Sequence, residues 1–188
     1  MRGNMRESEK IEAAVDEAEH NSGGTVPDTR NARQFRAALG RFATGVTVVT
    51  AREAGGGPPV GITANSFASV SLAPPLVLWS AARASLRHAH FTEAPAFAIH
   101  VLRDDQIDLA NRFTRNGAGF EGLEFTLSDQ GVPLLADALA RFECAAETRH
   151  EGGDHTIIIG RVLRFETSLE GEPLVFAHGQ YGRFLPKG

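Results

Sequence analysis

The sequence has 188 residues, of which 42% are hydrophobic, and a formal net charge of -4. These values fit one globular domain with a sizeable core, and the scattered 19 Lys and Arg residues argue against a nucleic-acid-binding surface. The single cysteine, Cys144, excludes an internal disulfide and a cysteine-based zinc site, and it favours a reducing, cytoplasmic location. Because no stretch approaches the roughly 18 apolar residues of a membrane span, we expect no membrane association.

Residues 1–29 are polar and mixed in charge, and they end in the turn-forming string NSGGTVPDT. This composition predicts a mobile N-terminal tail, followed by one domain over 30–188. The alternative for the tail is a short helix capped by Ser8, with Ile11 and Val15 on one face.

A helix is predicted over residues 31–43, ending before Gly45. Asn31 and Gln34 have the spacing of a capping box. Apolar residues then recur at helical spacing, at Phe35, Ala38, Leu39 and Phe42.

Short β segments dominate the next part of the chain. They are predicted at 45–51, 60–67, 69–72 and 76–81. Turn formers separate them, and Pro74 and Pro75 interrupt the last pair. Short strands at short intervals are typical of an antiparallel barrel or sandwich.

The second half of the chain continues this pattern with few helices. Short helices are predicted at 85–91 and after Asp104 or Asp105, whose carboxylates can cap a helix. Further strands are predicted at 96–102, 140–147, 155–166 and 173–184. The helices are too few to cover a parallel sheet, so the predicted fold is a β-barrel with peripheral helices.

Three features that look like functional motifs are interpreted as structural. The string GAGFEG (117–122) matches G-x-G-x-x-G, but a predicted helix precedes it where a dinucleotide site needs a strand. His88 and His90 lack further ligands at a recognisable spacing, so we expect solvated histidines and no metal site. Cys144 lies on the apolar face of a strand pattern, which predicts a buried thiol rather than a nucleophile.

The stretch GITANSFASVSL (61–72) gathers small hydroxyl and amide side chains in a strand-rich region. They are Thr63, Asn65, Ser66, Ser69 and Ser71. Short donors of this kind suit a flat ligand that carries carbonyls and ring nitrogens. An ordinary edge strand with a solvated polar face is the equal alternative on spacing alone.

A second candidate binding segment contains Arg83, Ser85 and Arg87. If Ser85 lies near a helix start, its hydroxyl, nearby backbone N–H groups and an arginine fork can together hold a phosphate. Solvated arginines on a surface helix are the alternative.

Five segments carry a further signal when they are taken together and in order. They are FRAALGRFATGVTVVTA, GITANSFASVSLAPPLVLWS, LANRFT, GGDHTIIIGRV and PLVFAHGQYGRF, which span about 33–185. In this combination the chain resembles the short-chain flavin reductases, the reductase components of two-component flavin-dependent monooxygenases. The resemblance implies an antiparallel split β-barrel, typically a homodimer, that binds FMN or FAD and uses NADH, or NADPH, as co-substrate.

The resemblance also implies which residues bind flavin. The isoalloxazine edge falls on Thr63, Ala64, Asn65 and Ser66, with Ser69 and Val70 close by. The phosphate or ribityl chain falls on Arg83, Ala84 and Ser85, and Phe113 lies near the ring. Two departures concern the same region, since many relatives have Asp at position 73 and Lys near the phosphate, where this chain has Ala73 and Arg83.

In this family the G-D-H motif lines the nicotinamide pocket, which places Asp154 and His155 there. His155 can donate a hydrogen bond to the carboxamide or phosphates of NADH, while Asp154 can fix the tautomer of the imidazole. A turn aspartate followed by a surface histidine is the alternative.

The implied function is hydride transfer from NADH to FMN or FAD, with delivery of reduced flavin to a partner monooxygenase. Two alternatives stay open. One is a flavoprotein with permanently bound FMN that transfers electrons or reduces a bound substrate, and the other is a non-enzymatic split-barrel module that binds a flat ligand. The sequence does not distinguish FMN from FAD, because it contains no recognisable motif for adenine contacts.

Overall fold

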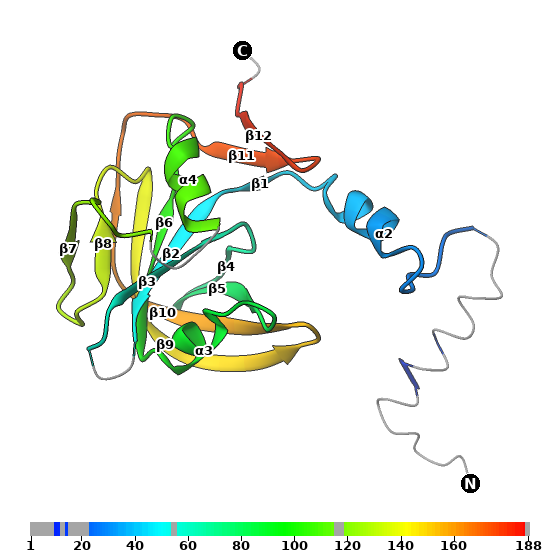
Figure 1. Ribbon diagram of the computed structural model, residues 1–188, viewed down its shortest axis with the longest axis horizontal. Helices are drawn as coiled ribbons and strands as arrows, with labels where there is room; N and C mark the ends of the chain where they lie inside the picture. Colours follow the sequence, from blue (N-terminus) through cyan, green and yellow to red (C-terminus); the bar gives the residue numbers. More distant parts are fainter. Residues whose placement is uncertain (1–9, 12–13, 15–22, 54–55, 115–118, 187–188) are drawn as a thin grey trace, which may run out of the picture. The chain divides into compact units, whose positions relative to one another are not determined.

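The computed structural model describes residues 10, 11, 14, 23–53, 56–114 and 119–186 (Figure 1). By its internal contacts the chain divides into two units, Met1–Phe42 and Ala43–Gly188. The tail helix expected at Ser8 starts outside the described residues, and the domain boundary expected after residue 29 stays a prediction. Within the described ranges, no helix combines the length and the apolar character needed to cross a membrane.

The first unit contains helix α2, Ala32–Leu39, which is shorter than predicted. Asn31 occupies the N-cap position but makes no capping hydrogen bond with its side chain. Instead, its amide accepts the Asp28 backbone N–H at 2.9 Å and donates to the Val26 carbonyl at 2.8 Å. The predicted capping box is therefore wrong, because the preceding turn already uses the Asn31 side chain.

The second unit is built on a seven-stranded antiparallel sheet in the order β3-β2-β6-β9-β10-β5-β4 (Figure 1). Its strands are β2 (Thr47–Arg52), β3 (Pro59–Ala64), β4 (Ala68–Leu72), β5 (Pro75–Ala82), β6 (Ala96–Val101), β9 (Ala140–Gly152) and β10 (His155–Thr167). The predicted class, mainly β with peripheral helices, is confirmed.

Smaller elements surround this sheet. Strands β1 (Thr44–Gly45), β11 (Leu174–Ala177) and β12 (Gln180–Arg183) form a second sheet, β7 (Phe125–Leu127) and β8 (Pro133–Leu135) form a hairpin, and the helices are α3 (His88–Glu93) and α4 (Ile107–Thr114). The sequence did not predict β8, since three residues beginning with proline resemble a loop. The expected aspartate cap of α4 is also wrong, because the helix begins at Ile107 and Gln106 directly precedes it. The Asp105 carboxylate pairs instead with Arg103, and Asp104 pairs with Arg183.

The main core lies on one face of the curved sheet. Along β5, Val77, Trp79 and Ala81 are buried and alternate with half-buried side chains, as a strand with one covered face requires. Trp79 packs edge-on against Phe91 of α3, with ring centroids 5.1 Å apart. Cys144 belongs to this core, and burial raises the pKa of its thiol to about 12. The prediction of a buried, unreactive thiol is confirmed.

A second core forms where α4 covers the opposite face of β2 and β3. Phe113 of α4 is completely buried there and packs edge-on against Phe120. A Cβ atom placed on Gly61 would lie 2.4 Å from the Phe113 ring, and one on Gly119 would lie 2.5 Å from it. Both positions must be glycine for the ring to fit, so β3 and α4 are held in close contact.

His100 of β6 is fully buried between β2 and β8. One ring nitrogen, Nδ1, lies 3.1 Å from the Val48 carbonyl, and the other, Nε2, lies 3.0 Å from the backbone N–H of Leu135. A carbonyl can only accept and an N–H can only donate, so the ring must be neutral with its proton on Nδ1. Burial is the main reason why the pKa of His100 is lowered to about 4.

This histidine predicts a loss of stability in mild acid. The folded-state pKa of about 4 lies below the ordinary value of 6.5, so the stabilisation is complete above pH 6.5 and is lost as the pH falls toward 4. The shift corresponds to about 3 kcal/mol. Urea unfolding at pH 7, 5.5 and 4.5 measures this, and His100→Gln should lose this part of the pH dependence. An equally steep decline in that variant would contradict the assignment.

Candidate functional site

The polar turn between β3 and β4 is attached to β5 by a side chain. Ser66 Oγ accepts the Ser80 backbone N–H at 2.9 Å and lies 3.3 Å from the Ser80 carbonyl. Ala68 pairs with Leu78 in the β4–β5 ladder, so Ser66 lies opposite Ser80 in the same register. The hydroxyl therefore continues the ladder by one step, beyond the point where backbone pairing stops.

The other residues of this motif divide between supporting and exposed positions. Thr63 donates its hydroxyl proton to the Ala110 carbonyl of α4 at 2.6 Å, so it holds β3 against the helix. Asn65, Ser69 and Val70 are exposed. Asn65 and Ser69 thus present the polar groups expected of a ligand-binding edge, while Ser66 and Thr63 use their hydroxyls within the fold.

His155 is the first residue of β10 and pairs with Ala82, at the end of β5. The hairpin that precedes it turns tightly at Gly153, whose φ is +67°. Asp154 Oδ1 lies 2.7 Å from His155 Nδ1. A carboxylate accepts a hydrogen bond, so it fixes the proton of His155 on Nδ1. Neutral His155 then presents Nε2 as an acceptor. The expected donation from His155 to NADH through Nε2 requires the imidazolium form.

Strand β5 brings the two motifs to one end of the sheet. Ser66 lies beside Ser80 on one side of β5, and His155 lies beside Ala82 on the other side. With strands about 4.8 Å apart and residues about 3.4 Å apart along them, the Cα atoms of Ser66 and His155 are roughly 12 Å apart. The two motifs that the sequence singled out thus border the same strand end.

Arg83 and Ser85 follow β5 at this same end. The Arg83 backbone N–H donates to the Asp154 carbonyl at 2.9 Å, and its guanidinium pairs with Glu151 at 3.0 Å. Ser85 Oγ accepts the Arg87 backbone N–H at 3.2 Å, and Ala84 is exposed. Helix α3 begins only at His88, so Ser85 does not sit at a helix start and the helix contributes less to a phosphate site than expected.

Arg87 does not take part in a phosphate site. Its Nη1 donates to the Gly61 and Phe113 carbonyls, both at 2.8 Å, and its Nη2 donates to the Thr114 carbonyl at 3.3 Å. Partial burial lowers the pKa of this guanidinium. The expectation that Arg87 binds phosphate is wrong, because its fork is occupied by β3 and by the C-terminal end of α4.

Phe113 lies behind the strand and not beside a ligand. Its side chain has no exposed surface and packs against Gly61, two residues before Thr63. A direct contact with a flavin ring would require this ring to leave the core. The structure therefore gives Phe113 the role of supporting β3.

The features interpreted as structural have identifiable partners. His88 Nε2 lies 2.9 Å from Thr156 Oγ1, and His90 lies 3.4 Å from Glu53, so these rings are more than simply solvated. Among the described residues, no group of three or more His, Cys, Asp or Glu side chains could hold a metal ion. The glycine-rich string 117–122 begins outside the described residues, and helix α4 precedes it, where a dinucleotide site would need a strand.

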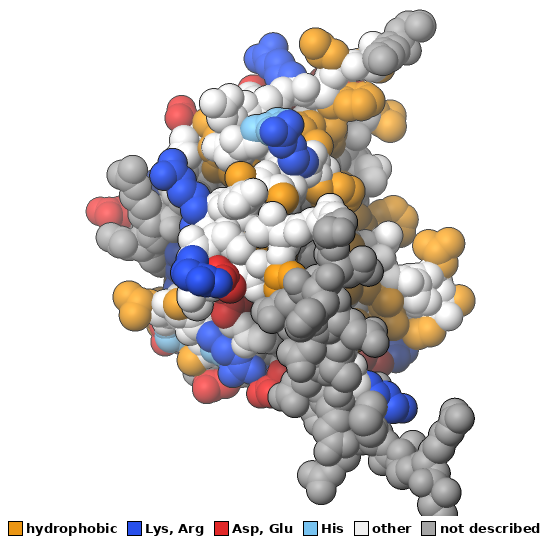
Figure 2. Space-filling view, turned by 90° about the vertical axis from the view of Figure 1, so that its right-hand side faces the viewer, with side chains coloured by type: hydrophobic (Ala, Val, Ile, Leu, Met, Phe, Trp, Pro, Cys, Tyr) orange, Lys and Arg blue, Asp and Glu red, His pale blue; other side chains and the backbone are white. Residues whose placement is uncertain are grey.

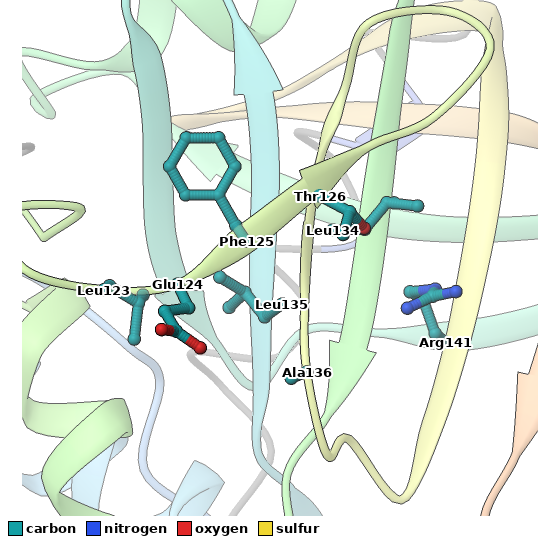
Figure 3. A pocket seen from close by; sticks show the side chains of 8 residues that line it. All are labelled: Leu123, Glu124, Phe125, Thr126, Leu134, Leu135, Ala136 and Arg141. Atoms are coloured by element: carbon teal, nitrogen blue, oxygen red, sulfur yellow. The ribbon is translucent and has the colours of Figure 1, made fainter.

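A separate cavity of about 630 Å³ lies beside the β7–β8 hairpin (Figure 3). Leu123, Phe125 and Leu134 line it, and Arg141 reaches it from β9. None of the residues expected to bind flavin or NADH lines this cavity.

On the face shown in Figure 2, Lys and Arg side chains lie apart from one another.

The chemistry of the groups at the end of β5 fits a flavin nucleotide. Asn65 is an exposed amide at this end that can bind carbonyls and ring nitrogens, and Arg83 is a guanidinium that can bind a phosphate. Ser69 is exposed too, but it lies opposite Val77, further back along β5. A mainly β fold with this polar strand end suits a binding site for a flat, phosphate-bearing ligand.

Comparison with known proteins identifies the family. Residues 39–185 match the flavin reductase like domain, and the chain belongs to this family. It is 57% identical over 159 residues to FMN reductase (NADH) SmoA of Agrobacterium fabrum, covering 85% of this chain and 90% of that protein. It is 38% identical over 165 residues to the flavin-dependent monooxygenase reductase subunit HsaB of Rhodococcus jostii, covering 87% and 84%.

A solved structure agrees with this assignment. The NADH:FAD oxidoreductase SgcE6 of Streptomyces globisporus superposes with a TM-score of 0.79 at 38% identity, covering 89% of this chain and 96% of that one. Some relatives are longer: the chain covers 49% of the length of one related protein and 53% of the length of one solved structure.

Arg87 yields a prediction about the scaffold of this site. Arg87→Met removes three hydrogen bonds to carbonyls of β3 and α4, so we expect the free energy of unfolding to fall by about 1–3 kcal/mol. Arg87→Lys keeps the charge but loses the planar fork, and it should give a smaller loss. Urea denaturation measures both, and a stability of Arg87→Met equal to that of the wild type would contradict the role.

Proposed function

We propose that the chain is an NADH:flavin oxidoreductase that reduces FMN or FAD and supplies the reduced flavin to a partner monooxygenase. The observation that carries this proposal is the placement of Ser66 and His155 on the two sides of one end of β5. Family membership and the names of the relatives SmoA, HsaB and SgcE6 support it.

The residues at this strand end would bind and align two planar substrates. Asn65 and nearby backbone groups at this end, with Ser69 further back along β4, would hold the polar edge of the flavin, and Arg83 its phosphate. His155 would orient the nicotinamide amide, with Nε2 accepting from the carboxamide NH₂ while Asp154 holds the other nitrogen. When flavin is bound, it accepts the hydride of NADH, so the protein contributes alignment rather than an acid or base.

Delivery of reduced flavin requires that the flavin leave. In the single chain the side chains of Asn65, Ser69 and Arg83 are exposed, so each polar contact with flavin replaces a contact with water and adds little affinity. Such a site favours a diffusing flavin over a permanently held one.

NADPH is a weaker candidate than NADH, since both SmoA and SgcE6 are named for NADH. A cytoplasmic location is part of the proposal, because a reduced, buried Cys144 suits a reducing compartment.

A homodimer would cover the face on which this site lies. On the outer side of the sheet, Leu78 of β5 pairs with Ile159 of β10, and both are half-buried, as is Ile157. His155 shares that outer side, since it lies two residues before Ile157. A second copy packed on this face would bury the apolar strip and enclose the site.

The central experiment follows NADH oxidation with FMN and FAD varied separately. We expect turnover of added free flavin and only weak retention of flavin on purification. Stoichiometric tight flavin without turnover would instead identify a permanent flavoprotein. A complete lack of NADH oxidation with either flavin would leave a binding module.

His155→Ala should lower kcat/KM for NADH by about 5- to 150-fold, which corresponds to about 1–3 kcal/mol of lost stabilisation. The Kd for flavin should stay close to that of the wild type, because His155 contacts the nicotinamide. Asp154→Asn, which leaves the imidazole in place but less firmly oriented, should give a smaller decrease. An unchanged kcat/KM for NADH in His155→Ala would remove this residue from the site.

The dimer can be tested by mass and by one substitution. We expect sedimentation equilibrium to give twice the monomer mass, and Leu78→Arg to give the monomer with much lower NADH oxidation, since a charge cannot be buried unpaired in an interface. Leu169→Arg is the control, because Leu169 is 100% exposed and lies away from this strip. A monomeric wild-type protein would contradict the proposal.

A further inference from the structure

The ion pair between Arg83 and Glu151 spans three strands at the end of the sheet. Arg83 follows β5 and Glu151 lies on β9, with β10 between them. Neighbouring strands are about 4.8 Å apart, so β5 and β9 are separated by roughly 10 Å. The long arginine side chain bridges this gap and brings Nη2 to 3.0 Å from Glu151 Oε1.

This pair lies beside the residues assigned to the two substrates. The Arg83 backbone N–H binds the Asp154 carbonyl, and the next residue, His155, pairs with Ala82. The guanidinium that the proposed function assigns to the flavin phosphate is therefore already held by a carboxylate of the same chain.

We propose that Glu151 sets the flavin affinity by competing with the flavin phosphate for the Arg83 guanidinium. The inference rests on the proposed function, in which Arg83 binds that phosphate. A guanidinium offers a bidentate face to either anion, and the Nη2 group that Glu151 occupies cannot serve both equally. Two anions at one guanidinium also repel each other, so bound phosphate favours displacement of the Glu151 side chain.

The exposure of the two partners makes this displacement easy. The Glu151 side chain is 91% exposed and that of Arg83 is 43% exposed. Glu151 can therefore move into water without losing a buried environment, and exposed ion pairs are weak. The competition should weaken flavin binding modestly and help reduced flavin to leave, which suits a reductase that supplies another enzyme.

The hairpin offers a matched control for this idea. Glu147 lies on the same strand β9 and pairs with Arg161 of β10, with 2.6 Å between Glu147 Oε1 and Arg161 Nη2. Glu147→Gln removes the same charge as Glu151→Gln, but it does so beside an arginine that has no role in the proposed site. The comparison separates competition at Arg83 from a general change in the charge of the hairpin.

The experiment titrates FMN and riboflavin, which lacks the phosphate, into the full-length protein and follows flavin fluorescence at fixed ionic strength. We expect Glu151→Gln to tighten FMN binding about two- to fivefold, the range set by exposed ion pairs, and to leave riboflavin binding unchanged. In an Arg83→Gln background, Glu151→Gln should have no effect. Glu147→Gln should leave the FMN affinity at the wild-type value.

Three results would overturn the inference. They are an unchanged or weaker FMN affinity in Glu151→Gln, an equal gain for riboflavin, and an equal gain in Glu147→Gln. NADH oxidation measured on the same samples separates this failure from that of the proposed function. A wild-type protein that oxidises NADH with FMN while Glu151→Gln binds FMN no more tightly would refute only the role of Glu151, whereas a wild type without FMN-dependent oxidation would refute the function itself.

Discussion

The register of strand β5 is the constraint on which the site depends. On one side, the Ser66 hydroxyl binds the backbone of Ser80, and on the other side His155 pairs with Ala82. Side chains alternate between the two faces of a strand, so a slip of one residue in the β5–β10 ladder would turn His155 toward the core and Thr156 outward. The buried Trp79 and Ile158, which pair across the same ladder, fix this register because neither can be moved to the exposed face without losing its apolar surroundings.

The position of β3 depends on packing more than on charge. Phe113 fills the space above Gly61, and burial of an aromatic ring of this size is worth about 1.5–3 kcal/mol. Arg87 then satisfies the Gly61, Phe113 and Thr114 carbonyls, which the strand and the end of α4 would otherwise leave without a donor. The strand that carries Thr63 and Asn65 is therefore fixed from behind, and the residues of the motif do not all face a ligand.

Much of the fold could be predicted from periodicity, and less of the site. Alternation and turn residues located most strands within a few residues, and the strand pattern around Cys144 correctly indicated a buried face. The local signals failed where another group competed for a side chain: the preceding turn at Asn31, the nearby Arg103 at Asp105, and the distant carbonyls of β3 and α4 at Arg87. The importance of Glu151 could not be predicted, because its partner Arg83 is 68 positions away along the chain and only the sheet order brings the two together.

The charges at the site argue for a ligand that binds and leaves. Arg83, Glu151, Asp154 and His155 are all reached by solvent, with side chains between 43% and 94% exposed. Charges in contact with water interact weakly, so no single ion pair here can supply a large binding energy. Affinity must therefore come mainly from apolar contact with the rings and from backbone groups. In the proposed dimer, a second copy on this face would enclose the exposed strand end and would link the apolar strip at Leu78 and Ile159 to the chemistry beside it.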